Sequence, residues 1–304
     1  MKGTREKVVV FGGSGFLGSH TADALSDFGY EVVIFDNVES PWLRQDQRMF
    51  VGDILDRRQV RDAVIGATYV YHFAGIAGIA DAKDRPLDAV QLNVLGTANA
   101  LQASVDAGIR RFVYASTMYV YSTFGSFYRA TKQAAENIVE AYHECHGLQY
   151  SMLRYGSLYG PRAQGWNGLK DYVTQVVRDG KLRIVGDDQR VREYIHVKDA
   201  ARLSVDVLDE MHANQAITVT GTQILKTSEL SEMIFEIAGV KVNVEAGPPE
   251  DLPTHYKITP YRYTPKPAKK LVPAEFVDIG QGILDLVEEV HAELHRQPRQ
   301  KLFT

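Results

Sequence analysis

The sequence has a single cysteine, Cys145, among 304 residues, and it has no excess of positive charge. One cysteine can form neither an internal disulfide nor a cysteine-ligated zinc site, so we expect a reducing, cytoplasmic location. With 34 Lys and Arg against 38 Asp and Glu, the formal net charge is −4, and nothing favours binding to nucleic acid. A chain of this length can bury enough apolar surface to fold without a structural metal.

Long apolar segments suited to a membrane are also missing. The segment from Ala63 to Ala80 carries no charge, but glycines, Thr68 and His72 interrupt it. It predicts a short buried strand and a glycine-rich loop rather than a membrane span. The basic and then apolar start of the chain imitates a signal peptide, but cleavage there would destroy the glycine motif described below.

Short β-branched or aromatic runs alternate with helix-length segments through the first half of the chain. This order predicts an α/β fold with a Rossmann-type doubly wound parallel sheet, covered by helices on both faces. The runs are KVVVFG, EVVIFD, RMFVGD, TYVYHFAG, RRFVYAST and QYSMLRYG.

The second half has a different texture. Seven of the eleven prolines fall between Pro248 and Pro273, which predicts irregular loop, with Lys266, Lys269 and Lys270 in a solvated part of it. An amphipathic helix is expected around Gly280 to His295.

We expect two interleaved domains, because YIHVKD and AITVTG should return to the first domain after the chain visits the second. Residues 1–160 plus about 192–222 would form the first domain, which the glycine motif described next identifies as a dinucleotide-binding domain. Residues from about 161–191 plus 223–304 would form a smaller α+β substrate-binding lobe.

A glycine-rich turn, Gly13-Ser14-Gly15-Phe16-Leu17-Gly18, follows the first predicted strand and opens a helix. Glycines allow the tight turn and the close approach to a pyrophosphate, which the helix N-terminus attracts. Asp36 ends the next strand, 18 residues after Gly18, where a carboxylate can hold the adenosine ribose. A 2′-phosphate about 4 Å from that carboxylate would meet roughly 4 kcal/mol of repulsion, so NAD is favoured over NADP.

Tyr128 and Lys132 lie four residues apart at the start of a predicted helix, after a strand that ends in Ser116-Thr117. Residues at this spacing share one helix face, so the Lys132 ammonium can approach the Tyr128 phenol. A phenol with a pKa near 10 needs about 4 kcal/mol of phenolate stabilisation to act as a base near neutrality. Lys132 and a cationic nicotinamide would provide it, with Thr117 bonded to the same substrate oxygen. His72 and His196 have no partners at metal-ligand spacing, so no metal is expected.

Together these motifs resemble the extended short-chain dehydrogenase/reductase family, in particular its NAD-dependent nucleotide-sugar epimerases and dehydratases. The resemblance also rests on Gly52-Asp53-Ile54, on HFAG from His72, on NVLGT from Asn93, on RYGSLYGPR from Arg154 and on VREYIHVKD from Val191. It implies catalysis by Thr117, Tyr128 and Lys132, a nucleoside-diphosphate sugar as substrate, and a homodimer.

The resemblance also implies two sets of binding residues. The residues that would hold NAD are Gly12, Gly13, Gly15, Phe16, Leu17, Gly18, Asp36, Asn37, Asp53, Ile54, Phe73, Ala74, Gly75, Asn93, Lys132 and Tyr155. The residues that would contact the sugar nucleotide are Thr117, Tyr119, Ser157, Asn167, Arg192 and Arg262. Arg192 would bind the diphosphate through its planar fork of donors, and Asn167 would cap a helix that faces the phosphates.

The reaction depends on groups beyond this common set. Dehydratases and decarboxylases of the family carry an acid just after the Ser-Thr pair, whereas Met118, Tyr119, Val120 and Tyr121 follow here. This favours epimerisation through a transient 4-keto sugar. Net oxidation at C4 by a 4-dehydrogenase of a surface-polysaccharide pathway is the main alternative; a 4,6-dehydratase and a non-catalytic NAD-binding or RNA-associated protein rank lower.

Three departures from the family pattern concern the sugar site. Only eleven positions separate Thr117 from Tyr128, which predicts a more open pocket than is usual in the family. Ser157 stands where the family commonly has asparagine. The family's second diphosphate arginine has no clear match before Asp251-Leu252-Pro253, and Arg262 is a candidate for its role.

Overall fold

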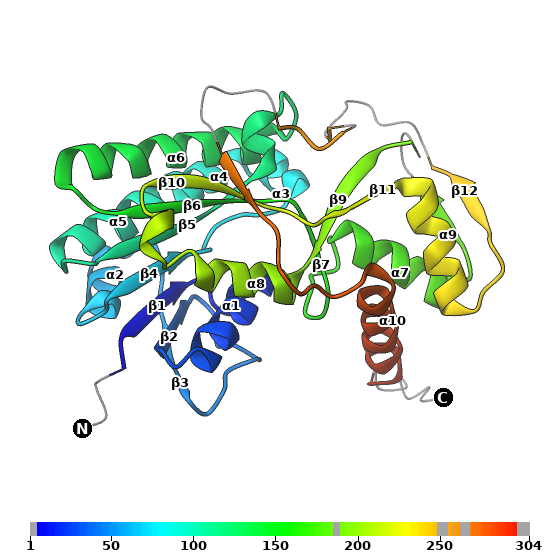
Figure 1. Cartoon of the computed structure of the whole chain (residues 1–304), viewed down its shortest axis with the longest axis horizontal. Coiled ribbons are helices and arrows are strands. Elements are labelled where there is room, and N and C mark those ends of the chain that lie inside the picture. Colours follow the sequence, from blue (N-terminus) through cyan, green and yellow to red (C-terminus); the bar gives the residue numbers. More distant parts are fainter. Residues whose placement is uncertain (1–4, 185–188, 248–254, 257, 262–267, 297–304) are drawn as a thin grey trace, which may run out of the picture.

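The computed structural model describes residues 5–184, 189–247, 255–256, 258–261 and 268–296 (Figure 1). Its main feature is an eight-stranded sheet in which every neighbouring pair is parallel, with the order β13-β10-β6-β5-β4-β1-β2-β3. The strands are β1 (Lys7–Phe11), β2 (Glu31–Asp36), β3 (Gln47–Val51), β4 (Tyr69–His72), β5 (Arg111–Thr117), β6 (Tyr150–Tyr155), β10 (Gln215–Val219) and β13 (Ala268–Leu271).

The strand sequences place apolar side chains on both faces of this sheet. Within β1, Val9 and Phe11 belong to one hydrophobic core, and Val8 and Val10 belong to another. Side chains alternate between the two faces of a strand, so a continuous apolar run produces a sheet with a core on each side. This confirms the predicted doubly wound architecture.

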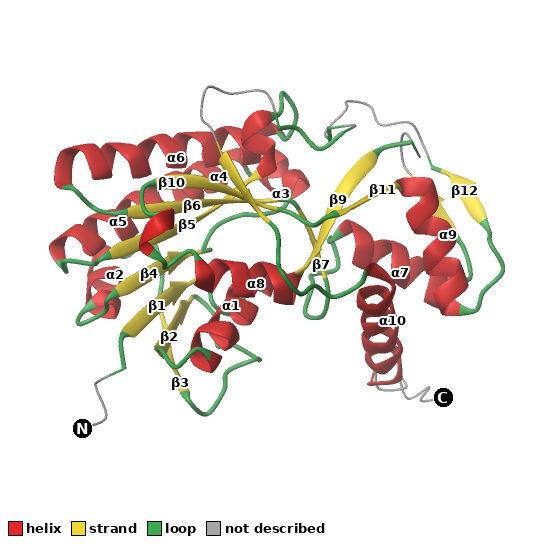
Figure 2. Cartoon of the chain, in the orientation of Figure 1, coloured by secondary structure: helices red, strands yellow, loops and turns green. Residues whose placement is uncertain are grey.

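Helices cover the two faces in separate layers (Figure 2). Helices α1 (Phe16–Asp27) and α8 (Val197–Asp206) pack together over the face of Val8. The opposite face is covered by α2 (Arg57–Val64), α5 (Gly96–Asp106) and α6 (Ser126–His146). The helix expected to begin near Tyr128 is α6, which starts two residues earlier.

A smaller lobe lies beside the large sheet, beyond the carboxyl ends of its strands. It contains a three-stranded sheet of order β11-β9-β7, a two-stranded sheet of β12 and β8, and its own core. Its elements are β7 (Ser157–Tyr159), α7 (Gly168–Asp179), β8 (Leu182–Ile184), β9 (Val191–His196), β11 (Gln223–Lys226), α9 (Thr227–Ala238), β12 (Val244–Ala246) and α10 (Ile279–Arg296). Helix α10 confirms the amphipathic helix expected around Gly280 to His295.

The described residues also contain five short helical elements. They are α3 (Ile79–Asp84), α4 (Pro86–Val90), the π-helix η1 (Gln91–Leu95) and the 3₁₀-helices η2 (Met118–Tyr121) and η3 (Glu210–His212).

Within the described part of the stretch from Pro248 to Pro273, residues 268–271 differ from the expected loop. Residues Ala268–Leu271 form β13, which extends the large sheet by pairing in parallel with β10. Lys270 is therefore part of an edge strand, and its ammonium lies 3.3 Å from the carboxylate of Glu193. An edge strand with lysines gives little apolar signal, which is why the sequence pattern missed it. Lys266 lies outside the described residues.

The segments YIHVKD and AITVTG, both expected to return to the cofactor domain, contribute strands to different sheets. AITV forms part of β10 in the large sheet. Tyr194 to His196 instead end β9 in the three-stranded sheet, and the helix that follows, α8, returns to pack against α1. The chain therefore crosses between the two lobes at this point.

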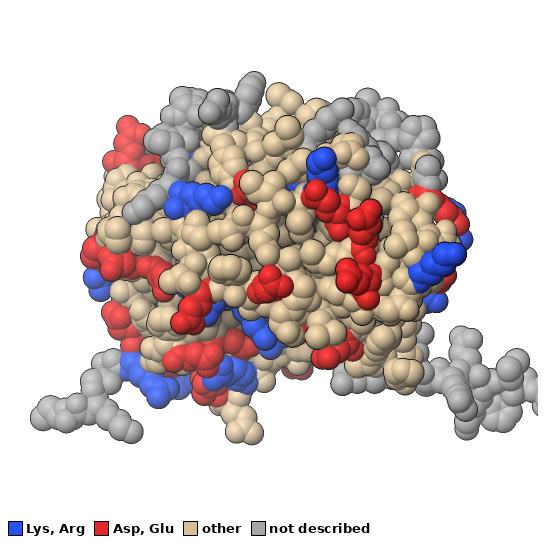
Figure 3. All heavy atoms as spheres, turned by 45° about the vertical axis from the view of Figure 1, so that its right-hand side comes forward, with Lys and Arg blue, Asp and Glu red and all other residues tan. Residues whose placement is uncertain are grey.

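The surface carries charges of both signs. On the face shown in Figure 3, Lys and Arg side chains are scattered among Asp and Glu and do not form a continuous basic stripe. Among the described residues, no helix combines the length and apolar character needed to cross a bilayer.

Candidate active site

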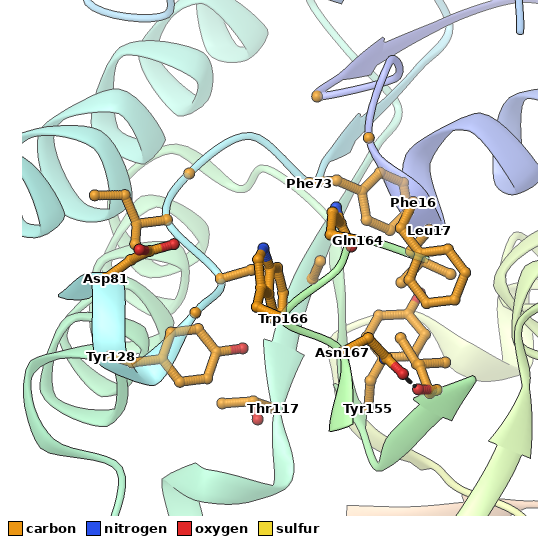
Figure 4. Close-up of a pocket in the computed structure, with 18 of the residues that line it drawn as sticks. Phe16, Leu17, Phe73, Asp81, Thr117, Tyr128, Tyr155, Gln164, Trp166 and Asn167 are labelled. Atoms are coloured by element: carbon orange, nitrogen blue, oxygen red, sulfur yellow. Dashed lines mark hydrogen bonds between the residues drawn. The ribbon is translucent and has the colours of Figure 1, made fainter. Parts of the chain in front are cut away.

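A cavity of about 790 Å³ opens between the large sheet and the smaller lobe (Figure 4). Several of its lining residues end strands of the large sheet: Asp36 ends β2, Thr117 ends β5 and Tyr155 ends β6. Open α/β sheets bind ligands in the crevice outside these carboxyl ends. The cavity therefore lies where the fold predicts a ligand site.

The glycine turn at one end of the cavity has no room for side chains. Gly12 has φ +78°, and a Cβ there would lie 2.5 Å from the backbone nitrogen of Ala74. At Gly18 a Cβ would lie 2.2 Å from the carbonyl oxygen of Gly12, so helix α1 and the turn can pack this closely only through glycine. Gly15 is the N-cap of α1 and offers no side-chain cap, which leaves the first turn of the helix open toward an anion.

Most of the predicted NAD residues line this cavity. Asp36 is held by the backbone N–H of Ser14, which donates to its carboxylate at 3.0 Å, and this carboxylate faces the cavity as a ribose-binding group should. The other predicted residues that line the cavity are Gly12, Gly15, Phe16, Leu17, Gly18, Asn37, Asp53, Ile54, Phe73, Ala74, Gly75, Lys132 and Tyr155. The cavity therefore fits a dinucleotide.

Two predicted NAD residues are not part of the cavity wall. Gly13 is buried against the side chain of Ile34, where a Cβ would approach within 2.8 Å. The Asn93 amide bonds the backbone N–H and carbonyl of Ile76 at 2.7 and 3.0 Å, and it donates to Thr131 Oγ1 at 3.0 Å. Asn93 thus ties the loop after β4 to helix α6 and positions the cavity wall from behind.

The three predicted catalytic residues meet at the other end of the cavity. Thr117 comes from the end of β5, whereas Tyr128 and Lys132 come from the first two turns of α6. The Lys132 ammonium donates to the carbonyl of Ala115 at 2.8 Å, and Thr117 hydrogen-bonds the Tyr128 phenol. Figure 4 shows Thr117 beside the hydroxyl end of Tyr128.

Burial shifts the pKa values of this pair in opposite directions. It raises the pKa of Tyr128 to about 12, although the hydrogen bond to Thr117 lowers it, and it lowers the pKa of Lys132 to about 8, although Glu136 raises it. The sequence predicts that Lys132 lowers the pKa of Tyr128; in the structure desolvation is the largest effect on the pKa of the phenol, and it is Thr117 that lowers it. At pH 7 a pKa of 12 corresponds to about 7 kcal/mol against the phenolate, so cofactor charge and substrate must contribute.

A buried ion pair fixes the two catalytic elements to each other. Glu136, one turn after Lys132, accepts from Arg154 at 2.7 and 2.9 Å and from the Ser116 hydroxyl at 2.5 Å. Arg154 also donates to the Tyr121 hydroxyl at 2.6 Å. Strands β5 and β6, helix α6 and η2 therefore meet at one network, which holds the strand end before Thr117 in place.

The predicted substrate residues lie on the side of the smaller lobe. The Arg192 guanidinium stacks 4.2 Å above the ring of Tyr256, and Tyr256 hydrogen-bonds Ser157 and packs on Tyr119. The side chain of Asn167 accepts from the backbone N–H of Lys170 at 3.2 Å, which confirms it as the N-cap of α7.

Tyr119, Ser157, Asn167 and Arg192 all line the cavity. Arg262 lies outside the described residues.

Comparison with known proteins assigns the family. Residues 8–220 match the model of the NAD dependent epimerase/dehydratase family. This match covers more than half of the chain. The chain belongs to the NAD-dependent epimerase/dehydratase family.

Individual members of this epimerase/dehydratase family differ in their reactions. The chain is 30% identical over 292 residues to a UDP-glucose 4-epimerase of Erwinia amylovora, covering 80% of this chain and 86% of that protein. It is 25% identical over 267 residues to a UDP-glucuronate 4-epimerase of Thermodesulfobacterium geofontis, covering 78% of this chain and 82% of that protein. A crystal structure of UDP-glucose 4-epimerase with UDP-glucose from Thermotoga maritima has the same fold, with TM-score 0.82 and 24% identity over 95% of this chain and 99% of that one.

Membership in the epimerase/dehydratase family confirms the predicted resemblance, and NAD is the cofactor of this family. Bound NAD supplies a hydride acceptor and a positive ring at the reacting carbon. In this chain the open first turn of α1 and Asp36 would hold its pyrophosphate and adenosine ribose, with Lys132 at the nicotinamide end.

Several lining residues of this epimerase/dehydratase site were not predicted from the sequence. They come from separate segments: Asp81 from α3, Gln164 and Trp166 from the segment before α7, Arg190 from the position just before β9, and His255 from a segment after β12. His255 Nδ1 lies 2.5 Å from the Tyr119 hydroxyl. None of them belongs to a local motif, so only the proximity of Trp166 to Asn167 could have suggested one.

The two conspicuous histidines have structural contacts. His72 Nε2 lies 2.9 Å from Thr97 Oγ1, and burial lowers the pKa of His72 to about 3, so the ring is neutral at physiological pH. His196 is the N-cap of α8 and accepts from the backbone N–H of Lys198. Among the described residues, no group of three His, Cys, Asp or Glu is placed to hold a metal ion.

Proposed function

We propose that this protein is an NAD-dependent nucleotide-sugar 4-epimerase that acts through a transient 4-keto sugar. The observation that carries the proposal is the meeting of Thr117, Tyr128 and Lys132 at one end of a cavity whose other end holds the glycine turn and Asp36. UDP-sugar 4-epimerases are among the relatives, which supports this choice within the family.

In the proposed reaction Tyr128 removes the proton from the sugar C4 hydroxyl as the carbon is oxidised. Thr117 donates a hydrogen bond to the same oxygen, which stabilises the negative charge that develops there. The Lys132 ammonium stabilises the Tyr128 phenolate. When the carbon is reduced again, Tyr128 returns the proton to the ketone oxygen.

Inversion requires the ketone to present its opposite face before reduction, so the diphosphate must be held while the sugar turns. Arg192 suits the first task, because stacking on Tyr256 fixes the plane of its guanidinium. The N-terminus of α7, capped by Asn167, lies in the same wall.

The residues after Thr117 do not supply the acid that elimination or decarboxylation uses. Met118–Tyr121 form η2, in which Met118, Val120 and Tyr121 are buried. This supports epimerisation over a 4,6-dehydratase. A 4-dehydrogenase that oxidises C4 would use the same catalytic residues, so only its product distinguishes it from a 4-epimerase.

Product analysis in deuterated water with a panel of UDP-sugars tests the proposal. An epimerase gives a product of unchanged mass with inverted C4, whereas a 4-dehydrogenase gives a ketone lacking two hydrogens together with reduced cofactor. Tyr128→Phe should abolish turnover and leave NAD binding intact. Full activity in that variant would contradict the assignment.

We also propose that the enzyme is a homodimer, as the family resemblance implies. Leu87 and Leu95 are 76% and 52% exposed on the helical run from α4 to α5, and Val90 lies exposed between them. Exposed apolar side chains gathered on one helical run suit a helix-to-helix interface. Light scattering should give a dimer for the wild type and a monomer for the Leu87→Lys, Leu95→Lys double variant; a monomeric wild type would contradict this proposal.

A further inference from the structure

Helix α3 brings a carboxylate to the reacting end of the cavity. Asp81 lines the cavity, and Figure 4 shows its carboxylate on the same side as the ring of Tyr128. The next residue, Ala82, is fully buried in a small apolar cluster against which Tyr128 packs. Asp81 therefore stands next to the catalytic tyrosine and not at the adenosine end, where Asp36 and Asp53 lie.

This carboxylate is exposed to the cavity and has no cation beside it. Within the described residues, the Asp81 side chain makes no ion pair and no hydrogen bond. Gly78 leaves it room, because a Cβ there would lie 2.9 Å from Asp81 Oδ2. Lys132 is the positively charged residue of the cavity wall that lies closest to Tyr128 along the chain, and its ammonium donates to the carbonyl of Ala115 and not to Asp81.

Arg192 belongs to a different part of the wall. Its guanidinium stacks on Tyr256 and Tyr256 packs on Tyr119. Tyr119 in turn contacts the ring of Tyr128, so two aromatic rings lie between Arg192 and the catalytic tyrosine. The nucleotide end of the substrate thus meets Arg192, whereas the sugar end meets, besides Lys132, a carboxylate that forms no ion pair.

We propose that Asp81 is a specificity residue that restricts this site to nucleotide sugars without a carboxylate. An ionised carboxylate only accepts hydrogen bonds, so it suits sugar hydroxyl or ammonium groups and repels a uronate. The inference rests on the proposed function and narrows its substrate class to neutral or amino sugars. It separates this chain from the UDP-glucuronate 4-epimerase among its relatives.

The alternative role for Asp81 is purely local. An acidic residue in the first turn of α3 interacts favourably with the helix dipole. That role predicts a small change in stability and no change in sugar preference. The two roles can therefore be separated by binding measurements.

The experiment compares binding of UDP-glucose and UDP-glucuronate by calorimetry with NAD present, in the Tyr128→Phe background so that neither ligand turns over. Two charges about 6 Å apart in a partly solvated site change affinity by about tenfold. We expect the Tyr128→Phe parent protein to bind UDP-glucose at least about tenfold more tightly than UDP-glucuronate. Adding Asp81→Asn should reduce this ratio of affinities about tenfold. Asp84→Asn, which removes an exposed charge from the same helix outside the cavity, should leave the preference unchanged.

Equal affinity for the two ligands in the parent, or the same change in both variants, would overturn the inference. So would a product lacking one water in the wild type that disappears in Asp81→Asn, because Asp81 would then be an acid of an elimination. Selective binding without any turnover of UDP-sugars by the wild type would contradict the epimerase proposal and leave the specificity role standing. Failure of both ligands to bind would overturn both.

Discussion

Replacing Lys132 with methionine should stabilise the protein at neutral pH while removing its activity. The Lys132 side chain is 6% exposed, and burial lowers its pKa from 10.5 to about 8. At about 1.4 kcal/mol per pKa unit, the buried charge costs about 3 kcal/mol at pH 7. Loss of the hydrogen bond to Ala115 offsets about 1 kcal/mol, so a net gain of about 2 kcal/mol is expected.

The stabilising effect of Lys132→Met should depend on pH, because the pKa of Lys132 differs between the folded and unfolded chain. The folded-state pKa lies below the unfolded value, so between pH 8 and 10.5 the unfolded chain holds the additional proton. The free energy of unfolding of the wild type therefore rises with pH through this window. Methionine does not titrate, so the advantage of Lys132→Met should be complete below pH 8 and shrink toward pH 10.

Guanidinium unfolding at pH 7 and pH 9.5, on NAD-free protein, measures this difference. Lys83→Met, at an exposed position on α3, is the matched control and should stay within about 0.5 kcal/mol of the wild type at both pH values. The kcat of Lys132→Met should fall at least about 100-fold. A variant less stable than the wild type at pH 7, or a stability difference that does not change with pH, would show that the buried Lys132 charge does not destabilise the fold.

Three further substitutions test other parts of the site. Asp36→Asn should weaken the preference for NAD over NADP by at least about tenfold in fluorescence titrations, because repulsion of the 2′-phosphate is removed; an unchanged ratio would show that Asp36 does not select the cofactor. Arg192→Met should raise the KM for the sugar nucleotide about tenfold or more with a smaller effect on kcat, because a fork of donors to the diphosphate is lost; a normal KM would place the diphosphate elsewhere. Glu136→Gln should lower the free energy of unfolding by about 3 kcal/mol, because Arg154 would keep a buried charge without its partner, and a loss under about 1 kcal/mol would contradict this.

The large sheet could be predicted because each of its first six strands is a complete local signal. The run VVVF in β1 supplies residues to the cores on both faces, and the glycine turn after it marks the start of α1. Strand β13 could not be predicted in this way. Its residues Ala268–Leu271 carry two lysines, and the strand forms because β10 offers an edge to pair with.

The residues of the candidate site also fall into two groups: those that local sequence spacing predicts and those that only tertiary packing brings to the cavity. Tyr128 and Lys132 are fixed by one helix, and Asp36 ends one strand, so their spacing in the sequence carries their geometry. Asp81, on the short helix α3, and Trp166, in the segment before α7, reach the cavity only through tertiary packing, and nothing in their neighbouring residues indicates this.

Asn93 shows the opposite case. The family pattern predicted a cofactor contact there, whereas its amide is used to join Ile76 to Thr131. A pattern of residues shows that a position matters to the site, but only the packed structure shows whether its side chain faces the cavity.

The fate of the hydrogen at C4 distinguishes a 4-epimerase from a 4-dehydrogenase. The purified protein with NAD is given the sugar nucleotide selected from the panel, labelled with deuterium at C4, and the product is analysed by mass spectrometry and NMR. A 4-epimerase gives a product with inverted C4 that keeps the deuterium, without accumulation of reduced cofactor. A 4-keto product that has lost the deuterium, with an equivalent amount of reduced cofactor, would contradict the epimerase proposal.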